Sequence, residues 1–157
     1  MNNDALYLAR AIALARQGSE SGAGGPFGAL IVRDGQILGE GYNRVVSSHD
    51  PTAHAEINAI RAACQATGHF HLPGSTLYTS SEPCPMCLAA AYWAHIERIV
   101  YANPREAAAA IGFSDAQLYQ QLTLPPAARS LKMEHLPVAG AEEPLKAWRE
   151  DLGRVGY

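Results

Sequence analysis

Two short stretches of the sequence carry residue types that bind metals. Residues 54–60 read HAEINAI, and residues 82–90 read EPCPMCLAA. Cys84 and Cys87 are three residues apart at a predicted helix start, so both sulfur atoms point to the same side. A helix N-terminus favours thiolate, because its free N–H groups and its dipole stabilise negative charge. The imidazole of His54 and two thiolates form a ligand set that suits zinc, because the thiolates cancel its charge.

The number of candidate ligands predicts an open metal site. Cys64, the third cysteine, lies ten residues beyond His54 on the same predicted helix. At a rise of about 1.5 Å per residue it would be about 15 Å away, too far to share an ion. We therefore interpret Cys64 as a small apolar residue and expect a water molecule in the fourth position. Zinc can lower the pKa of such a water toward about 7 and so supply hydroxide at neutral pH.

Glu56 is the candidate proton carrier. It lies two residues beyond His54, where its carboxylate can reach the water, take its proton and hand it to a leaving amine. His-x-Glu followed by Pro-Cys-x-x-Cys is the signature of zinc deaminases. Cys-x-x-Cys alone is a weak signal, since thioredoxin-like redox pairs share it, but the two halves together are specific. A closed or incidental site is the alternative, and the missing fourth ligand disfavours it.

The elements that must hold these residues follow from the hydrophobic pattern. Apolar residues at helical spacing predict a first helix over 4–17, which the stretch from Gly18 to Gly25 should end. Asp34-Gly35 between two apolar runs predicts a hairpin. The predicted strands are 28–33, 37–43, 76–80 and 97–101, and the further predicted helices are 54–66, 85–95, a stretch from 104 onward, and 142–152.

Strands separated by helices of this length predict an α/β fold, a three-layer α/β/α sandwich with a mixed central sheet. At 157 residues and 48% hydrophobic, the chain is long enough for one compact domain and too short for two, so we expect one domain over 1–157. Two helices that begin at the same edge of the sheet would bring the three candidate ligands together. Open α/β sheets bind their ligands at that edge.

Composition disfavours several classes of protein. Twelve Lys and Arg against fifteen Asp and Glu give a net charge of −3, which does not suit a protein that grips a phosphate backbone. Three cysteines form no disulfide scaffold and indicate a reducing compartment. The first residues, MNNDALYLARAIALARQG, show no secretory leader, and no apolar run is long enough to span a membrane. We expect a soluble, cytoplasmic protein that binds neither nucleic acid nor membrane.

The chain resembles the cytidine deaminase-like superfamily over nearly its whole length, and within it is similar to the bacterial guanine deaminases. The stretches that carry the resemblance are GGPFGALIV, GYNRV, DPTAHAEINAIRAAC, LYTSSEPCPMCLAAAYWA, GFSD and the closing KAWRE with the terminal tyrosine. The metal-binding motifs define only the superfamily. PCPMCLAAAYWA, GFSD and the terminal tyrosine point to the guanine branch.

This resemblance implies hydrolysis of guanine to xanthine and ammonia, with one zinc ion per subunit and the proton carrier named above. It implies that Asn43 and the backbone near Ala55 hold the purine base, that Phe27 packs on its ring, and that Asp115 and Tyr157 line the pocket. The C-terminal segment, about 129–157, is similar to one that exchanges between subunits. The resemblance therefore implies a domain-swapped homodimer in which the terminal tyrosine acts on the neighbour's site.

Each substrate contact also has a purely structural interpretation. Asn43 lies at a strand end, where turn-forming residues are common, and Phe27 could belong to the core. Asp115 could cap a helix, because Ser114-Asp115 precedes an apolar-periodic run. Tyr157 ends the chain, and chain ends often fray.

Other functions stay open at this stage. The substrate could be a related aminated ring such as guanosine, ammeline or cytosine. A tRNA adenosine deaminase shares both motifs, but it should be basic near its C-terminus, and residues 142–157 hold four acidic residues against three basic ones. A zinc-binding interaction module without activity is a third possibility, and Glu56 argues against it, because a structural site needs no proton carrier.

Overall fold

The described residues, 3–157, form two compact units in this computed structural model of the chain. The first unit ends at Asp115 and contains the sheet. The second unit is Ala116–Tyr157. The single domain expected over 1–157 stays a prediction.

A mixed four-stranded sheet forms the centre of the first unit. Its strands are β1 (Gly28–Arg33), β2 (Gln36–Tyr42), β3 (Thr76–Ser81) and β4 (Arg98–Asn103), in the order β2-β1-β3-β4. Strand β1 pairs antiparallel with β2 and β3, whereas β3 and β4 are parallel. Because β2 and β3 are both antiparallel to β1, they run in the same direction and end at the same edge. All four predicted strands are confirmed, with their ends within two residues.

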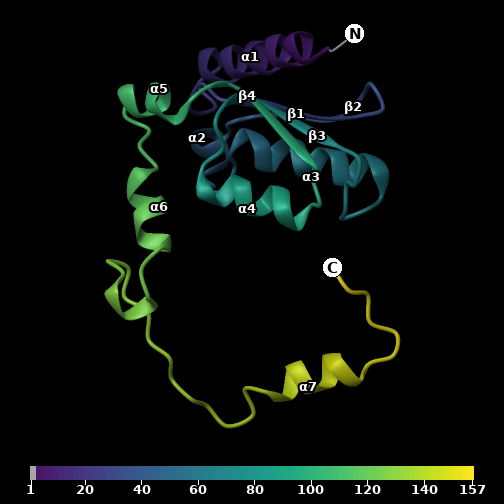
Figure 1. The fold of residues 1–157 in the computed structure, drawn as a ribbon, viewed down its shortest axis with the longest axis vertical. Helices are drawn as coiled ribbons and strands as arrows, with labels where there is room; N and C mark the ends of the chain where they lie inside the picture. The colour runs from purple at the N-terminus through teal and green to yellow at the C-terminus, as the bar shows by residue number, and fades with distance from the viewer. Residues whose placement is uncertain (1–2) are drawn as a thin grey trace. The chain divides into compact units, whose positions relative to one another are not determined.

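Helices cover both faces of this sheet, which confirms the predicted three-layer sandwich (Figure 1). Successive side chains of a strand point to opposite faces, so β1 contributes to two separate cores. Its residues Leu30 and Val32 pack with helix α1 (Asp4–Glu20), and Ala29 and Ile31 pack with helices α3 (Ala55–Thr67) and α4 (Pro85–Trp93). Two short helices, α2 (Val45–Ser48) and α5 (Arg105–Ala110), complete the unit.

The hairpin between β1 and β2 forms as the Asp-Gly pair predicts. Asp34 and Gly35 have φ angles of 50° and 76°, and they join Arg33 to its partner Gln36. Positive φ at both central residues defines the type I′ turn, whose twist matches that of the flanking strands.

Helix α1 continues past the glycine that was expected to end it. The helix runs to Glu20, so the predicted end at 17 was wrong by nearly one turn. A Cβ atom added to Gly18 would lie 2.6 Å from Cδ2 of Tyr42. The glycine therefore allows the helix to pack tightly on β2 and does not act as a stop signal.

The second unit has little tertiary structure of its own. It consists of helix α6 (Ala116–Leu122), the 3-10 turn η1 (Pro126–Ala128), helix α7 (Glu143–Glu150) and connecting segments. No residue from 116 to 157 is buried, and its apolar side chains, including Leu136 and Leu145, are exposed. The unit therefore has no hydrophobic core. Along residues 3–157, no helix combines the length and the apolar character needed to cross a membrane.

Helix α3 packs on β2 so closely that its backbone touches the strand. Ala55, Ala59 and Ala63 repeat at a spacing of four along α3 and are fully buried. They lie over Gly41 and Gly39 of β2. A Cβ atom on Gly41 would lie 2.6 Å from the carbonyl oxygen of Ala55 and 2.7 Å from the amide nitrogen of Ala59. Small residues on both elements therefore set how near the start of α3 comes to the end of β2.

We expect Gly41→Ala to lower the free energy of unfolding by about 1–3 kcal/mol, because its methyl group would collide with the backbone of α3 and not with a flexible side chain. Urea denaturation of the full chain measures the change. Gly156→Ala is the matched control, because a Cβ atom there meets nothing within 4 Å. Equal stability of the two variants would show that α3 can move away from β2 freely.

Candidate active site

The first residues of the site are held by the N-termini of two helices. His54 is the N-cap residue of α3 (φ −70°, ψ 158°), and Cys84 is the N-cap residue of α4 (φ −69°, ψ 168°). Neither side chain caps its own helix, so both remain available for other partners. Pro85 occupies the first turn of α4, where a missing N–H group costs nothing.

The three predicted metal ligands lie together. Nδ1 of His54 is 3.6 Å from Sγ of Cys84 and 3.5 Å from Sγ of Cys87, and all three ligand atoms lie within 4.8 Å of one another. A tetrahedral zinc ion at its usual bond lengths needs nitrogen and sulfur ligands about 3.6 Å apart. The spacing of these atoms therefore fits zinc.

This cluster contains three ligands and not four. Among the described residues, no other histidine, cysteine or carboxylate joins the group that could hold an ion. Cys64 instead packs against the hydrophobic core beneath α3. Three protein ligands are typical of catalytic zinc sites, which keep the fourth position for water or substrate, whereas structural sites are closed by a fourth side chain.

The cluster favours a thiolate even without a metal. The hydrogen bond from Cys87 lowers the pKa of Cys84 to about 4, and His54 acts in the same direction against the effect of burial. The pKa of Cys87 is raised, first by this contact with Cys84 and then by burial. The hydrogen bond to Cys84 also raises the pKa of His54. The negative charge that a cation would neutralise is thus already centred on Cys84.

Glu56 lies buried in the first turn of α3, with 6% of its surface exposed. Oγ1 of Thr79 lies 3.4 Å from its Oε1, and the same hydroxyl lies 3.0 Å from the carbonyl oxygen of Ser81. Burial raises the pKa of this carboxyl group, and the negative charge of Cys84 raises it further. A carboxyl group with a raised pKa is better matched to holding and releasing a proton near neutral pH.

The predicted base-holding residues surround the same helix start. Asn43 follows β2 and is buried, and its Oδ1 accepts a hydrogen bond from the backbone N–H of Val45 at 3.1 Å. Asn43 therefore makes the turn contact that its position at a strand end predicts. Phe27 packs against the core that contains Ala55, the first residue of α3, and its ring meets the edge of Phe113 with centroids 5.0 Å apart.

Asp115 and Tyr157, the last two predicted pocket residues, belong to different units. Asp115 is half-buried at the end of the first unit. Burial raises its pKa, and the charge of Cys84 raises it further, so Asp115 lies within electrostatic reach of the cluster. Helix α6 begins at the next residue, Ala116. Tyr157 belongs to the second unit, and its role in the pocket stays a prediction.

The matches to known proteins agree with this geometry. The family model of the cytidine and deoxycytidylate deaminase zinc-binding region matches residues 1–103, which include His54, Glu56, Cys84 and Cys87. The chain belongs to the cytidine and deoxycytidylate deaminase family.

Relatives within this deaminase family differ in how much of the chain they match. The guanine deaminase of Bacillus subtilis strain 168 is 44% identical over 99% of both chains, and its crystal structure has a TM-score of 0.95 over 100% of this chain and 99% of that one. The tRNA-specific adenosine deaminase of the same organism is 39% identical over 64% of this chain and 62% of its own. The protein in a solved complex with 2,6-diaminopurine is 33% identical to this chain, and its structure has a TM-score of 0.66 over 69% of this chain and 61% of that one.

Several residues that support the deaminase centre gave little signal in the sequence. Thr79, whose hydroxyl contacts Glu56, lies within a strand whose pattern indicates only burial. Phe113 lies in the stretch GFSD, where the resemblance implies a role for Asp115 alone. Glu82, two residues before Cys84, donates its N–H to the carbonyl of Asn103 at 2.8 Å and accepts the N–H of Arg105 at 3.0 Å. These contacts fix the loop that presents the first thiol.

We expect Cys87→Ala to abolish stoichiometric zinc binding, because it leaves only two of the three ligands. Zinc per chain is measured by elemental analysis after dialysis against a weak chelator. Cys64→Ala is the matched control and should retain one zinc per chain, because Cys64 packs in the core outside the cluster. Equal zinc content in the two variants would contradict this assignment.

Proposed function

We propose that the chain catalyses the hydrolytic deamination of guanine to xanthine and ammonia. The observation that carries the proposal is the full-length similarity to a guanine deaminase, which extends through the second unit as well as the first. The tRNA deaminase relative matches only part of the chain.

His54, Cys84 and Cys87 would hold one zinc ion in a site with an open fourth position. Bound zinc lowers the pKa of a coordinated water toward about 7 and so supplies a nucleophile at neutral pH. Glu56 would take one proton from that water and give it to a ring nitrogen, and would then take the second proton, from the added hydroxyl group, and give it to the leaving amine. Burial of Glu56 supports this role, because it raises the pKa of the carboxyl group that must hold the proton.

The purine base is held by residues around the start of α3. Oδ1 of Asn43 is occupied by Val45, so its amide N–H₂ group is the part it offers to an acceptor atom of the base. The backbone N–H of Ala55 is at the first helical position and has no partner within the helix, which makes it a second donor. Phe27, steadied by the edge of Phe113, packs on the ring, and Asp115 accepts an N–H of the base.

A tRNA substrate is the weaker alternative. Proteins that bind nucleic acid neutralise phosphates with clustered Lys and Arg. The segment beyond Asp115, residues 116–157, carries five Lys and Arg against five Asp and Glu, a net charge of zero. This segment therefore lacks the excess of positive charge that would favour binding to a phosphate backbone.

We further propose that the enzyme is a cytoplasmic homodimer in which the segment of about 129–157 completes the partner's site through Tyr157. The second unit has many apolar side chains but buries none of its residues. Exposed apolar surface of this kind usually marks a surface that another chain covers. A reducing compartment keeps the two ligand thiols free of disulfide bonds.

The central experiment is an ammonia-release assay of purified, zinc-loaded protein against guanine, guanosine, ammeline, cytosine, adenine and an anticodon stem-loop RNA. We expect guanine to have the highest kcat/KM. Turnover of cytosine or of the RNA without turnover of guanine would refute the substrate assignment. Salt-sensitive binding of the RNA would support the alternative.

Glu56→Gln tests the proton carrier within the same assay. We expect a loss of about 10²- to 10⁴-fold in kcat, because the amide cannot accept the proton, while zinc per chain stays at one. Glu20→Gln, the same change at an exposed position, is the control and should keep full activity. Undiminished ammonia release by Glu56→Gln would rule out Glu56 as the carrier.

The exchanged segment is tested by complementation between two inactive variants. Glu56→Gln and Tyr157→Ala should each be inactive as homodimers of twice the 16.8 kDa chain mass. Mixed after unfolding and refolding, they should recover about a quarter of the wild-type activity, because each swapped heterodimer holds one intact site. Light scattering verifies the dimer mass. A monomer, or a mixture that stays inactive, would contradict the exchange.

A further inference from the structure

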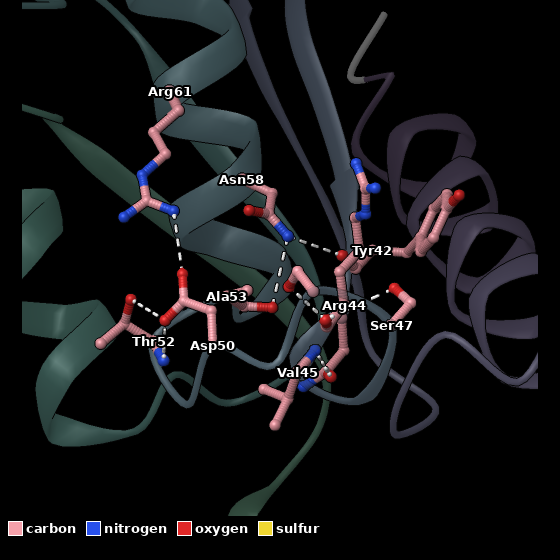
Figure 2. A network of polar contacts seen from close by, with 11 residues as sticks. Tyr42, Arg44, Val45, Ser47, Asp50, Thr52, Ala53, Asn58 and Arg61 are labelled. Carbon is pink, nitrogen blue, oxygen red and sulfur yellow. Dashed lines mark hydrogen bonds and ion pairs between the residues drawn. The ribbon is translucent and has the colours of Figure 1, made fainter.

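The side chain of Asn58 bonds two backbone segments at once. Asn58 lies in the second turn of α3, four residues after His54, and is half-buried. Its Nδ2 donates one hydrogen bond to the carbonyl oxygen of Tyr42 at 2.9 Å and a second to the carbonyl oxygen of Ala53 at 3.3 Å (Figure 2). No motif in the sequence distinguishes this residue from an ordinary helix position.

The two acceptors have a particular place in the chain. Tyr42 is the residue before Asn43, and Ala53 is the residue before His54. The side chain of Asn58 therefore connects two backbone segments. One leads into Asn43, the proposed base-holding residue, and the other leads into His54, the first metal ligand. These two segments are separated along the chain by the loop that contains α2.

Other contacts also join the same two segments. The N–H of Arg44 donates to the carbonyl of Ala53 at 2.9 Å. Asp50 accepts the N–H of Thr52 at 2.8 Å, which shapes the turn before Ala53 (Figure 2). Gly41 contributes from the strand, because a Cβ atom there would lie 2.8 Å from Cβ of Asn58 and would push the helix out of reach.

The chemistry of the contact selects asparagine. Two backbone carbonyls face the side chain, and a terminal amide can donate to both because it carries two N–H groups. A carboxylate of the same shape has no donor and would place its oxygen atoms against the two carbonyls. Apolar side chains of similar size would leave both carbonyls without this partner.

We propose that Asn58 is a positioning residue that holds His54 and Asn43 at the separation needed for a metal-activated water to reach the bound base. The part of this role that concerns the bound base rests on the proposed function, whereas the part that concerns His54 rests on geometry alone. A displacement of about 1 Å between reacting groups can reduce the rate about a hundredfold. Residues that orient metal ligands typically change metal affinity or activity about ten- to a hundredfold when replaced.

The test is Asn58→Asp in the full chain, assayed for zinc affinity by competition with a chromogenic chelator and for KM and kcat with guanine at saturating zinc. We expect zinc affinity to fall about ten- to a hundredfold and KM to rise. The added negative charge would by itself attract a cation, so weaker zinc binding would indicate displaced ligands. Asn58→Ala, which removes the donors without adding charge, should shift both quantities in the same direction and serves if Asn58→Asp does not fold.

Two controls separate positioning from general stability. Gln65→Glu makes the same amide-to-acid change at an exposed position of the same helix and should leave zinc affinity and KM unchanged. Val32→Ala opens the core on the α1 face of the sheet, and it should lower the melting temperature without changing zinc affinity at 25 °C. If Asn58 merely stabilised the fold, its variants would behave like Val32→Ala.

Unchanged zinc affinity in both Asn58 variants would overturn the proposal, whatever happens to the melting temperature. Failure of the proposed function gives a different result. A wild-type chain that binds zinc but does not deaminate guanine would refute the substrate assignment, and the zinc affinities of the Asn58 variants would then decide the positioning role by themselves.

Discussion

The site depends on the backbone contact between helix α3 and strand β2. Glycine on the strand and alanine on the helix remove the side chains that normally keep such elements apart. The N-terminus of α3 is therefore pressed against the end of β2, so that His54, Glu56 and Asn43 come from two elements that cannot shift independently. Precise placement of catalytic groups requires such rigid support, since loops alone position side chains poorly.

Burying a carboxyl group beside a thiolate opposes folding, and a bound cation would offset that cost. Burial raises the pKa of Glu56 because a buried charge loses its hydration, and the negative charge of Cys84 raises it further. Both helix N-termini direct partial positive charge toward this region, which offsets part of the repulsion. A bound dication would remove the rest, because binding to the folded chain alone adds to its stability.

Local sequence patterns predicted the fold better than they predicted its contacts. The strands, the Asp34-Gly35 hairpin and the layers follow from periodicity and turn chemistry, which are properties of neighbouring residues. The spacing of Cys84 and Cys87, with the signature motif around His54, predicted the cluster, because only a few types of side chain bind zinc. Gly18 was misinterpreted, and Thr79 and Asn58 gave no signal, since their roles arise only where distant segments meet.

The part of the chain that the family model matches lies wholly within the first unit. The family model of a zinc-binding region ends at residue 103, and the tRNA deaminase relative is likewise partial. The region that the model matches holds the cluster and Glu56, the residues suited to metal and proton chemistry. Nothing in that chemistry specifies which ring carries the amine. Residues outside the matched region, Asp115 and Tyr157 among them, can differ between branches without disturbing the cluster or Glu56. A second unit with no core of its own is suited to that variation, since its sequence is constrained by what it contacts and not by its own folding.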